Sequence, residues 1–150
     1  MLPILENTSH SCGSCTACCT VMHVPVLKKE SHQNCLHQCS SGCNIYKSRP
    51  TECREYKCFW ISHTDNLNLR PDKLGVILEI SDTKIGRAVI VREVRKDASE
   101  SPLAQEFINL VSERIKGFVY VFKTDNSKNV VFPEWAKDAL EGNVEKGYIQ

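Results

Sequence analysis

The sequence predicts an α+β fold in which a loop-rich cysteine lobe packs on a small mixed or antiparallel sheet with two helices. Three observations carry this prediction. All nine cysteines lie between Cys12 and Cys58. After Ile61 the composition changes to β-branched runs separated by polar turns, which is typical of strands. Over residues 101–117 the apolar side chains recur at helical spacing.

A chain of 150 residues can form one domain with a real core, or a small metal-stabilised lobe resting on a conventional one. We expect a cysteine-rich metal-binding lobe over residues 1–60 and a small α+β region over residues 61–150, together forming one compact unit. The 19 basic and 18 acidic residues give a formal net charge of +1. Such a balance does not favour a polyanion-binding surface, so nucleic acid is not an expected partner.

The cellular compartment decides how nine thiols can be used. Residues 1–6 carry no positive charge or long apolar run of the kind a signal peptide needs, and no later stretch approaches membrane-spanning length. We therefore expect a cytoplasmic protein with no membrane partner. In a reducing compartment disulfides are disfavoured, and an odd number of cysteines cannot all pair within one chain. Metal ligation accounts for the set better than a disulfide framework does.

Residues 12–19 hold four cysteines with small residues between them, which let backbone amides turn toward sulfur. This pattern predicts a metal-binding knuckle and not a helix. The segment 28–34 is polar, and we expect it to be exposed.

Cys35, Cys39 and Cys43 are spaced by four residues, which on a helix would place them on one face. However, the sequence Ser-Ser-Gly at 40–42 predicts that any helix ends before Cys43. A short helix is then expected over 51–57, with Pro50 in its first turn.

The second half has ordinary strand and helix patterns. Residues 76–80 and 87–94 are β-branched runs separated by the polar residues 81–84, which predicts a hairpin. The pair Ser101-Pro102 predicts a helix start, with a capping hydroxyl followed by proline, and Gly117 predicts its end.

Two further segments complete the predicted α+β region. Residues 118–122 and 129–132 are expected to form a second pair of strands across the polar turn 123–128. A short final helix is expected over 133–140, ended by Gly142. This half should supply the apolar core, whereas the cysteine lobe should gain much of its folding free energy from metal.

The adjacent cysteines Cys18 and Cys19 bear on the number of metal sites. Neighbouring side chains tend to diverge, so the pair predicts two sites or a polynuclear cluster, with one thiol serving each. A closed structural zinc takes four ligands, so eight thiolates would fit two zinc ions. The spacing does not say which four belong together.

Zinc is the favoured metal, and an iron–sulfur cluster is the alternative. The spacing Cys12-x2-Cys15-x2-Cys18 also opens a bacterial ferredoxin run, although the expected x3-Cys-Pro does not follow. Zinc sites more usually combine knuckle pairs across a long loop, which the spread of the cysteines allows. Thiolates are soft ligands that bind both zinc and iron–sulfur clusters, so ligand softness does not distinguish the two.

Other polar groups are weaker candidates. No serine–histidine–acid arrangement, carboxylate pair or phosphate loop is present, so we expect no catalysis by this chain itself. Four basic residues near the later cysteines could neutralise thiolates, although each is expected to be an exposed charge: Lys47, Arg49, Arg54 and Lys57. The histidines are expected to lie at the surface, with His37 the best exception because it lies between two cysteines: His10, His23, His32, His37 and His63.

The order of these residues resembles a known family. The pattern is Cys12-x2-Cys15-x2-Cys18-Cys19, then Cys35-Leu36, then Cys43-Asn-Ile-Tyr46-x2-Arg49-Pro50-x2-Cys53-Arg54-x-Tyr56-x-Cys58. It is similar to the bacterial YkgJ-like cysteine-cluster family, whose CxxCxxCC domain is described as zinc- or iron-chelating. The later segment Arg70-Pro71-Asp72, followed by Gly75 and a strand, also resembles longer members.

The resemblance implies a set of eight metal ligands: Cys12, Cys15, Cys18, Cys19, Cys35, Cys43, Cys53 and Cys58. Cys39 has no counterpart in the family pattern, so it is expected to be a free or substituting thiol. A similar cluster occurs in flagellin lysine methylases, but this chain has no glycine-rich nucleotide loop. The expected function is therefore metal binding, with structural zinc or an iron–sulfur cluster in electron transfer or as an accessory to a modifying enzyme. A protein partner is possible but not specified.

Overall fold

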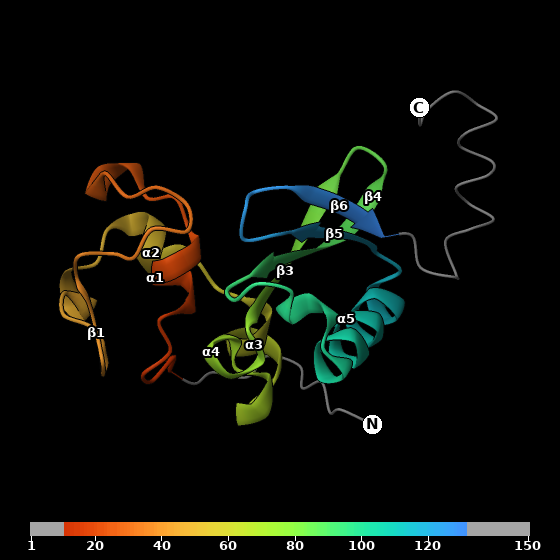
Figure 1. Cartoon of the computed structure of the whole chain (residues 1–150), viewed down its shortest axis with the longest axis horizontal. Helices are drawn as coiled ribbons and strands as arrows, with labels where there is room; N and C mark the ends of the chain where they lie inside the picture. The colour runs from red at the N-terminus through yellow and green to blue at the C-terminus, as the bar shows by residue number, and fades with distance from the viewer. Residues whose placement is uncertain (1–10, 132–150) are drawn as a thin grey trace.

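The cysteine lobe and a four-stranded sheet lie side by side in the structure, a computed structural model that describes residues 11–131 (Figure 1). The predicted α+β class and the mixed sheet are both confirmed. The helix predicted over 133–140, and the last residue of the strand predicted over 129–132, lie outside the described residues.

The sheet has the strand order β3-β4-β5-β6. These strands span Val76–Thr83, Gly86–Glu93, Phe118–Phe122 and Lys128–Val131. The β3–β4 and β5–β6 pairs are antiparallel, whereas β4 and β5 are parallel. A parallel pair needs a long crossover, and here helix α5 (Pro102–Ile115) provides it.

Helix α5 begins and ends close to the predicted residues. The Ser101 hydroxyl accepts a hydrogen bond from the amide of Ala104 at 3.3 Å, and Pro102 occupies the first turn. At the other end Lys116 adopts a left-handed backbone conformation, just before Gly117. The buried face of the helix, which includes Phe107, packs with strands β3, β4 and β5 in the main core.

The described helices are otherwise short. The α-helices are α1 (Ala17–Val21), α2 (Thr51–Glu55), α3 (Phe59–His63) and α4 (Pro71–Leu74). The 3-10 turns are η1 (Pro25–Leu27), η2 (Tyr46–Ser48), η3 (Leu67–Leu69) and η4 (Ala98–Glu100). A two-stranded hairpin pairs β1 (Gln38–Cys39) with β2 (Gly42–Cys43).

Two expectations about the cysteine segments need correction. Residues 12–19 are not free of helix, because α1 begins at Ala17 and includes both Cys18 and Cys19. The spacing of Cys39 and Cys43 reflects facing strands of a hairpin, and Gly42 there has a φ of +131°, which favours glycine.

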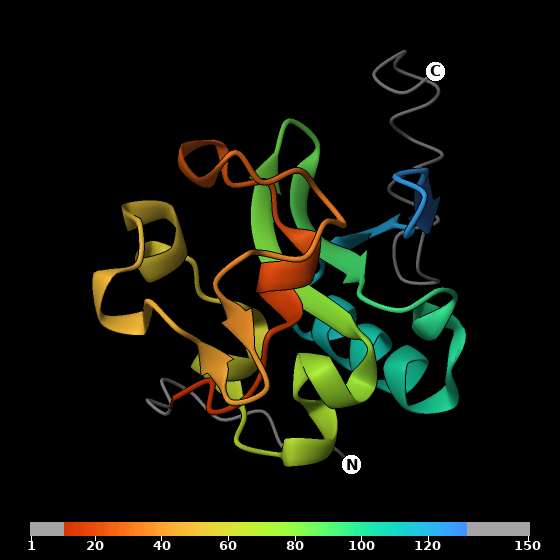
Figure 2. The same ribbon diagram turned by 60° about the vertical axis from the view of Figure 1, so that its left-hand side comes forward.

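Strand β3 is buried on both faces, because the main core covers one face and helix α1 of the cysteine lobe covers the other. Side chains alternate along a strand. Val76 and Leu78 therefore belong to the main core, whereas Ile77 packs with Ala17 and Val21 of α1 in a second cluster. Figure 2 shows α1 lying beside β3. The continuous apolar run at the start of β3 follows from this double burial.

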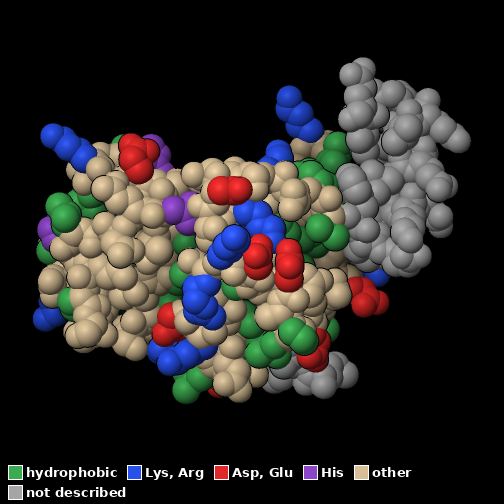
Figure 3. All heavy atoms as spheres, viewed as in Figure 1, with side chains coloured by type: hydrophobic (Ala, Val, Ile, Leu, Met, Phe, Trp, Pro, Cys, Tyr) green, Lys and Arg blue, Asp and Glu red, His purple; other side chains and the backbone are tan. Residues whose placement is uncertain are grey.

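No helix in residues 11–131 is both long enough and apolar enough to cross a bilayer. On the face shown in Figure 3, acidic and basic side chains are interspersed near the centre of the molecule.

Candidate metal centre

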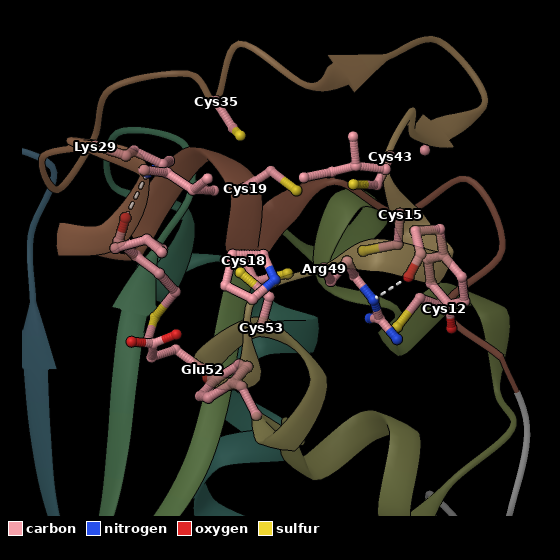
Figure 4. Close-up of a pocket in the computed structure, with 18 of the residues that line it drawn as sticks. Cys12, Cys15, Cys18, Cys19, Lys29, Cys35, Cys43, Arg49, Glu52 and Cys53 are labelled. Carbon is pink, nitrogen blue, oxygen red and sulfur yellow. Dashed lines mark hydrogen bonds between the residues drawn. The ribbon is translucent and has the colours of Figure 1, made fainter.

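Seven of the eight cysteines in the predicted ligand set line one cavity of about 110 Å³ in the cysteine lobe. Figure 4 shows them entering from different parts of the chain, including helix α1, the hairpin and helix α2. These cysteines are Cys12, Cys15, Cys18, Cys19, Cys35, Cys43 and Cys53. Residues up to 41 positions apart in the sequence therefore share one small space, which is the behaviour expected of a common ligand set.

The eighth predicted ligand, Cys58, does not line the cavity. It precedes helix α3 and packs with Cys15 and Cys18 against the apolar cluster of Ala17, Val21 and Ile77. Cys58 is thus adjacent to the cavity wall on the side of the sheet.

Cys39 stands apart from the other cysteines. It does not line the cavity, and its Sγ lies 3.4 Å from the Ser41 hydroxyl. Hydrogen bonds from Ser41 lower the pKa of the Cys39 thiol. This position agrees with the absence of Cys39 from the resemblance.

All nine cysteines are free thiols in the structure, and none forms a disulfide. Among residues 11–131 no group of three or more His, Cys, Asp or Glu side chains has its donor atoms placed to hold a metal ion. Thiols are the donors that a thiophilic metal takes, so the chemistry of this set fits such a metal. The side chains of residues 11–131, however, do not form a coordination sphere.

Burial disfavours the ionised form of several of these thiols when no cation is bound. It raises the pKa of Cys12 and Cys15, and it raises that of Cys58 to about 11. The Cys18 thiol donates a hydrogen bond to Cys19, which lowers the pKa of Cys19 and raises that of Cys18. A bound metal is the usual way to hold buried sulfur as thiolate.

Backbone amides point at several of these sulfur atoms. The amide of Ala17 donates to Cys15, and the amides of Trp60 and Ile61 donate to Cys58. The amide of His37 lies 3.5 Å from the sulfur of Cys35. Such N–H···S contacts orient metal-binding thiolates and offset their charge. For His37, then, the backbone and not the ring reaches the site.

Lys29 is a functional candidate that the sequence did not indicate. The segment 28–34 was expected to be exposed, but Lys29 is only 4% exposed. Its ammonium donates to the carbonyls of Thr20 and Met22 at the end of α1 and to that of the neighbouring Glu30. Burial lowers its pKa, and the neighbouring thiols, Cys35 and Cys19 first, oppose that effect. No signal in the sequence separates Lys29 from its exposed neighbour Lys28.

Of the four basic residues considered near the later cysteines, Arg49 is the one that lines the cavity. Its guanidinium lies over the ring of Tyr46, 3.7 Å from the centroid. Its positive charge opposes the burial that raises the pKa of Cys12, and it adds to the hydrogen bond from Cys18 that lowers the pKa of Cys19. The other three, Lys47, Arg54 and Lys57, are exposed as expected.

The segment Arg70-Pro71-Asp72 reaches the first cysteine turn. Arg70 and Asp72 form a paired contact, with N–O distances of 2.6 and 2.8 Å. Nη2 of Arg70 also donates to the hydroxyl of Ser14 at 3.3 Å. Asp72 in turn contacts Cys15 through both its amide and its carboxylate. Helix α4 is therefore tied to the turn that carries Cys12 and Cys15.

The histidines mostly lie away from the sulfur atoms. His23 lines the cavity, but its side chain is 52% exposed and lies 3.8 Å from Glu30. His63 stacks on Phe59, with ring centroids 4.2 Å apart. His10 lies outside the described residues.

Comparisons of this chain with protein-family models, curated proteins and solved structures found no match. The resemblance of residues 12–58 to the YkgJ-like family stays a prediction.

Proposed function

We propose that this protein binds metal through its clustered cysteines, which hold one or two structural zinc ions in the lobe. The observation that carries the proposal is the convergence of seven cysteines, from distant parts of the chain, on one cavity. They converge there as free thiols, without any disulfide among them. Sulfur-rich sites of this kind suit zinc, which takes four thiolate ligands in structural sites.

The residues proposed as ligands are the eight that the family resemblance implies: Cys12, Cys15, Cys18, Cys19, Cys35, Cys43, Cys53 and Cys58. Zinc bound there would cross-link loops that have few apolar contacts of their own. Buried Lys29 and the partly buried Arg49 would offset part of the thiolate charge. The side chains must draw together to complete a coordination sphere, since no such group is preformed in residues 11–131.

The proposal also covers location and partners. An odd number of cysteines cannot all pair within one chain, and so many thiols suit a reducing compartment, so we place the protein in the cytoplasm. The metal is proposed to be architectural, with no reaction of its own. An unidentified protein partner is compatible with this role.

An iron–sulfur cluster is the second candidate. It is favoured by the x2, x2 spacing of the first three cysteines, which the cavity brings together with the others. In that case the protein would serve electron transfer or assist a redox or modifying enzyme.

The test is the metal content of the full chain, purified anaerobically without added metal, together with its visible spectrum. Stoichiometric zinc in a colourless protein supports the main proposal. Stoichiometric iron in a brown protein that bleaches on reduction supports the iron–sulfur candidate instead. A chain with no stoichiometric metal contradicts both.

A further inference from the structure

We propose that a second cavity binds a small organic anion, namely a monocarboxylate with an aromatic or branched apolar body. This cavity measures about 190 Å³ and lies between helix α3, the β3–β4 hairpin and the last turns of helix α5. It shares no described lining residue with the cysteine cavity. The inference therefore adds a binding activity to the proposed metal binding and does not depend on it.

The cavity forms because the apolar face of strand β3 continues past the helices that cover it. Side chains alternate along a strand, so Ile80 lies on the same face as Leu78 of the main core. Leu78 is 3% exposed, whereas Ile80 is 37% exposed. Helix α3 ends at His63 and helix α5 at Ile115, while the tip of the β3–β4 hairpin projects beyond the rest of the sheet (Figure 1). An apolar side chain is thus left open to the cavity.

The floor of the cavity is apolar and fixed by the main core. Phe59 and Val111 line it and are 5% and 1% exposed. The ring of Phe59 meets that of Phe107 edge-on, with centroids 5.7 Å apart. Ile115 lines the cavity as well and packs against the same core. Because these side chains are already held in place, an apolar ligand would pay little to order them.

Basic side chains from three different elements surround this floor. Arg87 comes from β4, Arg114 from α5 and His63 from α3, and the described lining residues include no acidic side chain. A guanidinium group can bind a carboxylate with two parallel hydrogen bonds. The convergence of cationic groups beside an apolar floor is complementary to an anion that carries an apolar body.

The charge of the site favours a single negative charge on the ligand. Asp82, which is 89% exposed, lies 3.7 Å from Arg87 and offsets one of the two guanidinium groups. The charge of the other guanidinium then remains for a ligand. A multivalent anion would in addition bring charge against the apolar floor, where desolvation is costly. A monocarboxylate fits these conditions better than a phosphate does.

The imidazole of His63 is held in position for a polar contact. Its ring lies parallel to that of Phe59, with centroids 4.2 Å apart and planes 7° apart. Its Nδ1 lies 3.3 Å from the carbonyl oxygen of Phe59. A proton on Nδ1 would be donated to this carbonyl, which leaves Nε2 as the ring nitrogen for a ligand.

The size of the cavity limits the ligand. Its volume is below the roughly 300 Å³ at which pockets for drug-sized molecules begin. A single aromatic ring or a branched chain with a short acidic arm is the size of molecule expected there. Phenylpropionate has these features and is the probe for the test.

The test is a titration of the full chain, isotopically labelled for amide NMR, with phenylpropionate and two matched compounds. Phenylpropanamide keeps the apolar body without the charge, and acetate keeps the charge without the body. Phenylpropionate should cause saturable shifts at millimolar or lower concentration, centred on residues 59–63, 80–87 and 111–115. Each matched compound should bind at least about tenfold more weakly. Equal binding of either one, no saturable shift, or shifts centred on the cysteine cavity would overturn the inference.

Substitutions then test the assigned contacts. Arg114→Gln should weaken phenylpropionate binding by about tenfold, because a charged donor is lost. Lys84→Gln removes the same charge from an exposed lysine that does not line the cavity, and it should change the affinity by less than about twofold. Equal losses in the two variants would show only a general attraction between charges and would contradict a built site.

Filling the cavity gives an independent check. Ile80→Trp places a larger apolar side chain at a position that is already 37% exposed, and it should abolish binding of phenylpropionate. Unchanged amide shifts in the cysteine lobe show that this variant is folded. Binding as strong as that of the unmodified chain would contradict the inference. If a variant does not fold, the comparison of the three compounds on the unmodified chain still decides the question.

Zinc content is measured on the same samples, so that this inference and the proposed function are tested separately. A folded chain without metal that binds phenylpropionate contradicts only the proposed function. A zinc-loaded chain that does not bind phenylpropionate contradicts only the anion site.

Discussion

The phenol of Tyr56 donates a hydrogen bond to Oε2 of Glu79 across 2.7 Å, from the wall of the cysteine cavity to strand β3. The other oxygen of Glu79 accepts from Arg92 on β4 at 3.1 Å. Burial, with the charge of Glu79, raises the pKa of Tyr56, so the phenol stays protonated and remains a donor at neutral pH. This contact joins the cysteine lobe to the sheet.

Replacing Tyr56 by phenylalanine keeps the ring but removes this donor. We expect Tyr56→Phe to lower the free energy of unfolding by about 1–3 kcal/mol, because the lost bond has a charged acceptor. Urea denaturation followed by circular dichroism measures the change. Tyr46→Phe, at a tyrosine that is 45% exposed, is the control and should change it by less than about 0.5 kcal/mol. Equal effects of the two substitutions would show that the contact does not join the lobe to the sheet.

The fold was largely predictable from the sequence where local and tertiary signals agree. The helix over 101–117 was found because Ser101 and Pro102 are start signals and the apolar face has helical spacing. The hairpin after Val76 was also found. Its predicted turn at 81–84 was too early, because the strands continue to the Thr83–Gly86 pair and only two residues connect them.

The candidate site was only partly predictable. Spacing and resemblance indicated the cysteines, which are local in sequence, and seven of them share a cavity. The buried position of Lys29 depends on the carbonyls of Thr20 and Met22 at the end of α1, so its own neighbours in the sequence do not indicate it. Short elements such as α1 and the β1–β2 hairpin were missed because tertiary contacts override their weak local propensities.

Lys29 should stabilise the lobe and retain its metal. Lys29→Met removes the ammonium that three carbonyls accept from, and we expect a loss of about 1–3 kcal/mol in the free energy of unfolding. Zinc loss to a chelator should become faster, because the thiolates lose a nearby positive charge. Both are measured against Lys28→Met, its exposed neighbour, which should behave like the unmodified chain. Identical behaviour of the two variants would contradict the assigned role.

The contact of Asp72 with Cys15 predicts a local effect on the turn that carries Cys12 and Cys15. In the zinc-loaded chain, Asp72→Asn weakens the Arg70 pairing and should speed alkylation of Cys12 and Cys15 by about tenfold, as loss of an outer hydrogen-bond partner often does. Cys35 and Cys43 should be unaffected. The control is Asp82→Asn, at a carboxylate that is 89% exposed at the hairpin tip. A uniform rise at all four cysteines would contradict a role confined to the turn of Cys12 and Cys15.

Glu93 makes the sheet sensitive to acid. It is fully buried and accepts hydrogen bonds from Ser99 at 2.5 Å and from Lys123 at 3.1 Å. Burial alone raises the pKa of Glu93, but these hydrogen bonds together hold it below its ordinary value. The stabilisation is therefore fully present above the ordinary carboxyl pKa of about 4.3 and is lost as the pH falls through the folded-state value.

The prediction is tested with Glu93→Gln. Its free energy of unfolding should be lower by about 2–3 kcal/mol at neutral pH, and the difference from the unmodified chain should shrink in acid. Urea denaturation over a pH series measures both. Glu100→Gln removes an exposed partner of the same lysine and should cost less than about 1 kcal/mol. Parallel pH profiles for Glu93→Gln and the unmodified chain would rule out the assigned linkage.

Native mass spectrometry of the full chain, isolated without added metal, tests the central claim most directly. The account predicts a mass that exceeds the polypeptide by one or two zinc ions, less the protons that the thiols release, and a return to the bare polypeptide mass after treatment with chelator in acid. A bare polypeptide mass from the start, with all nine cysteines open to alkylation, would contradict it.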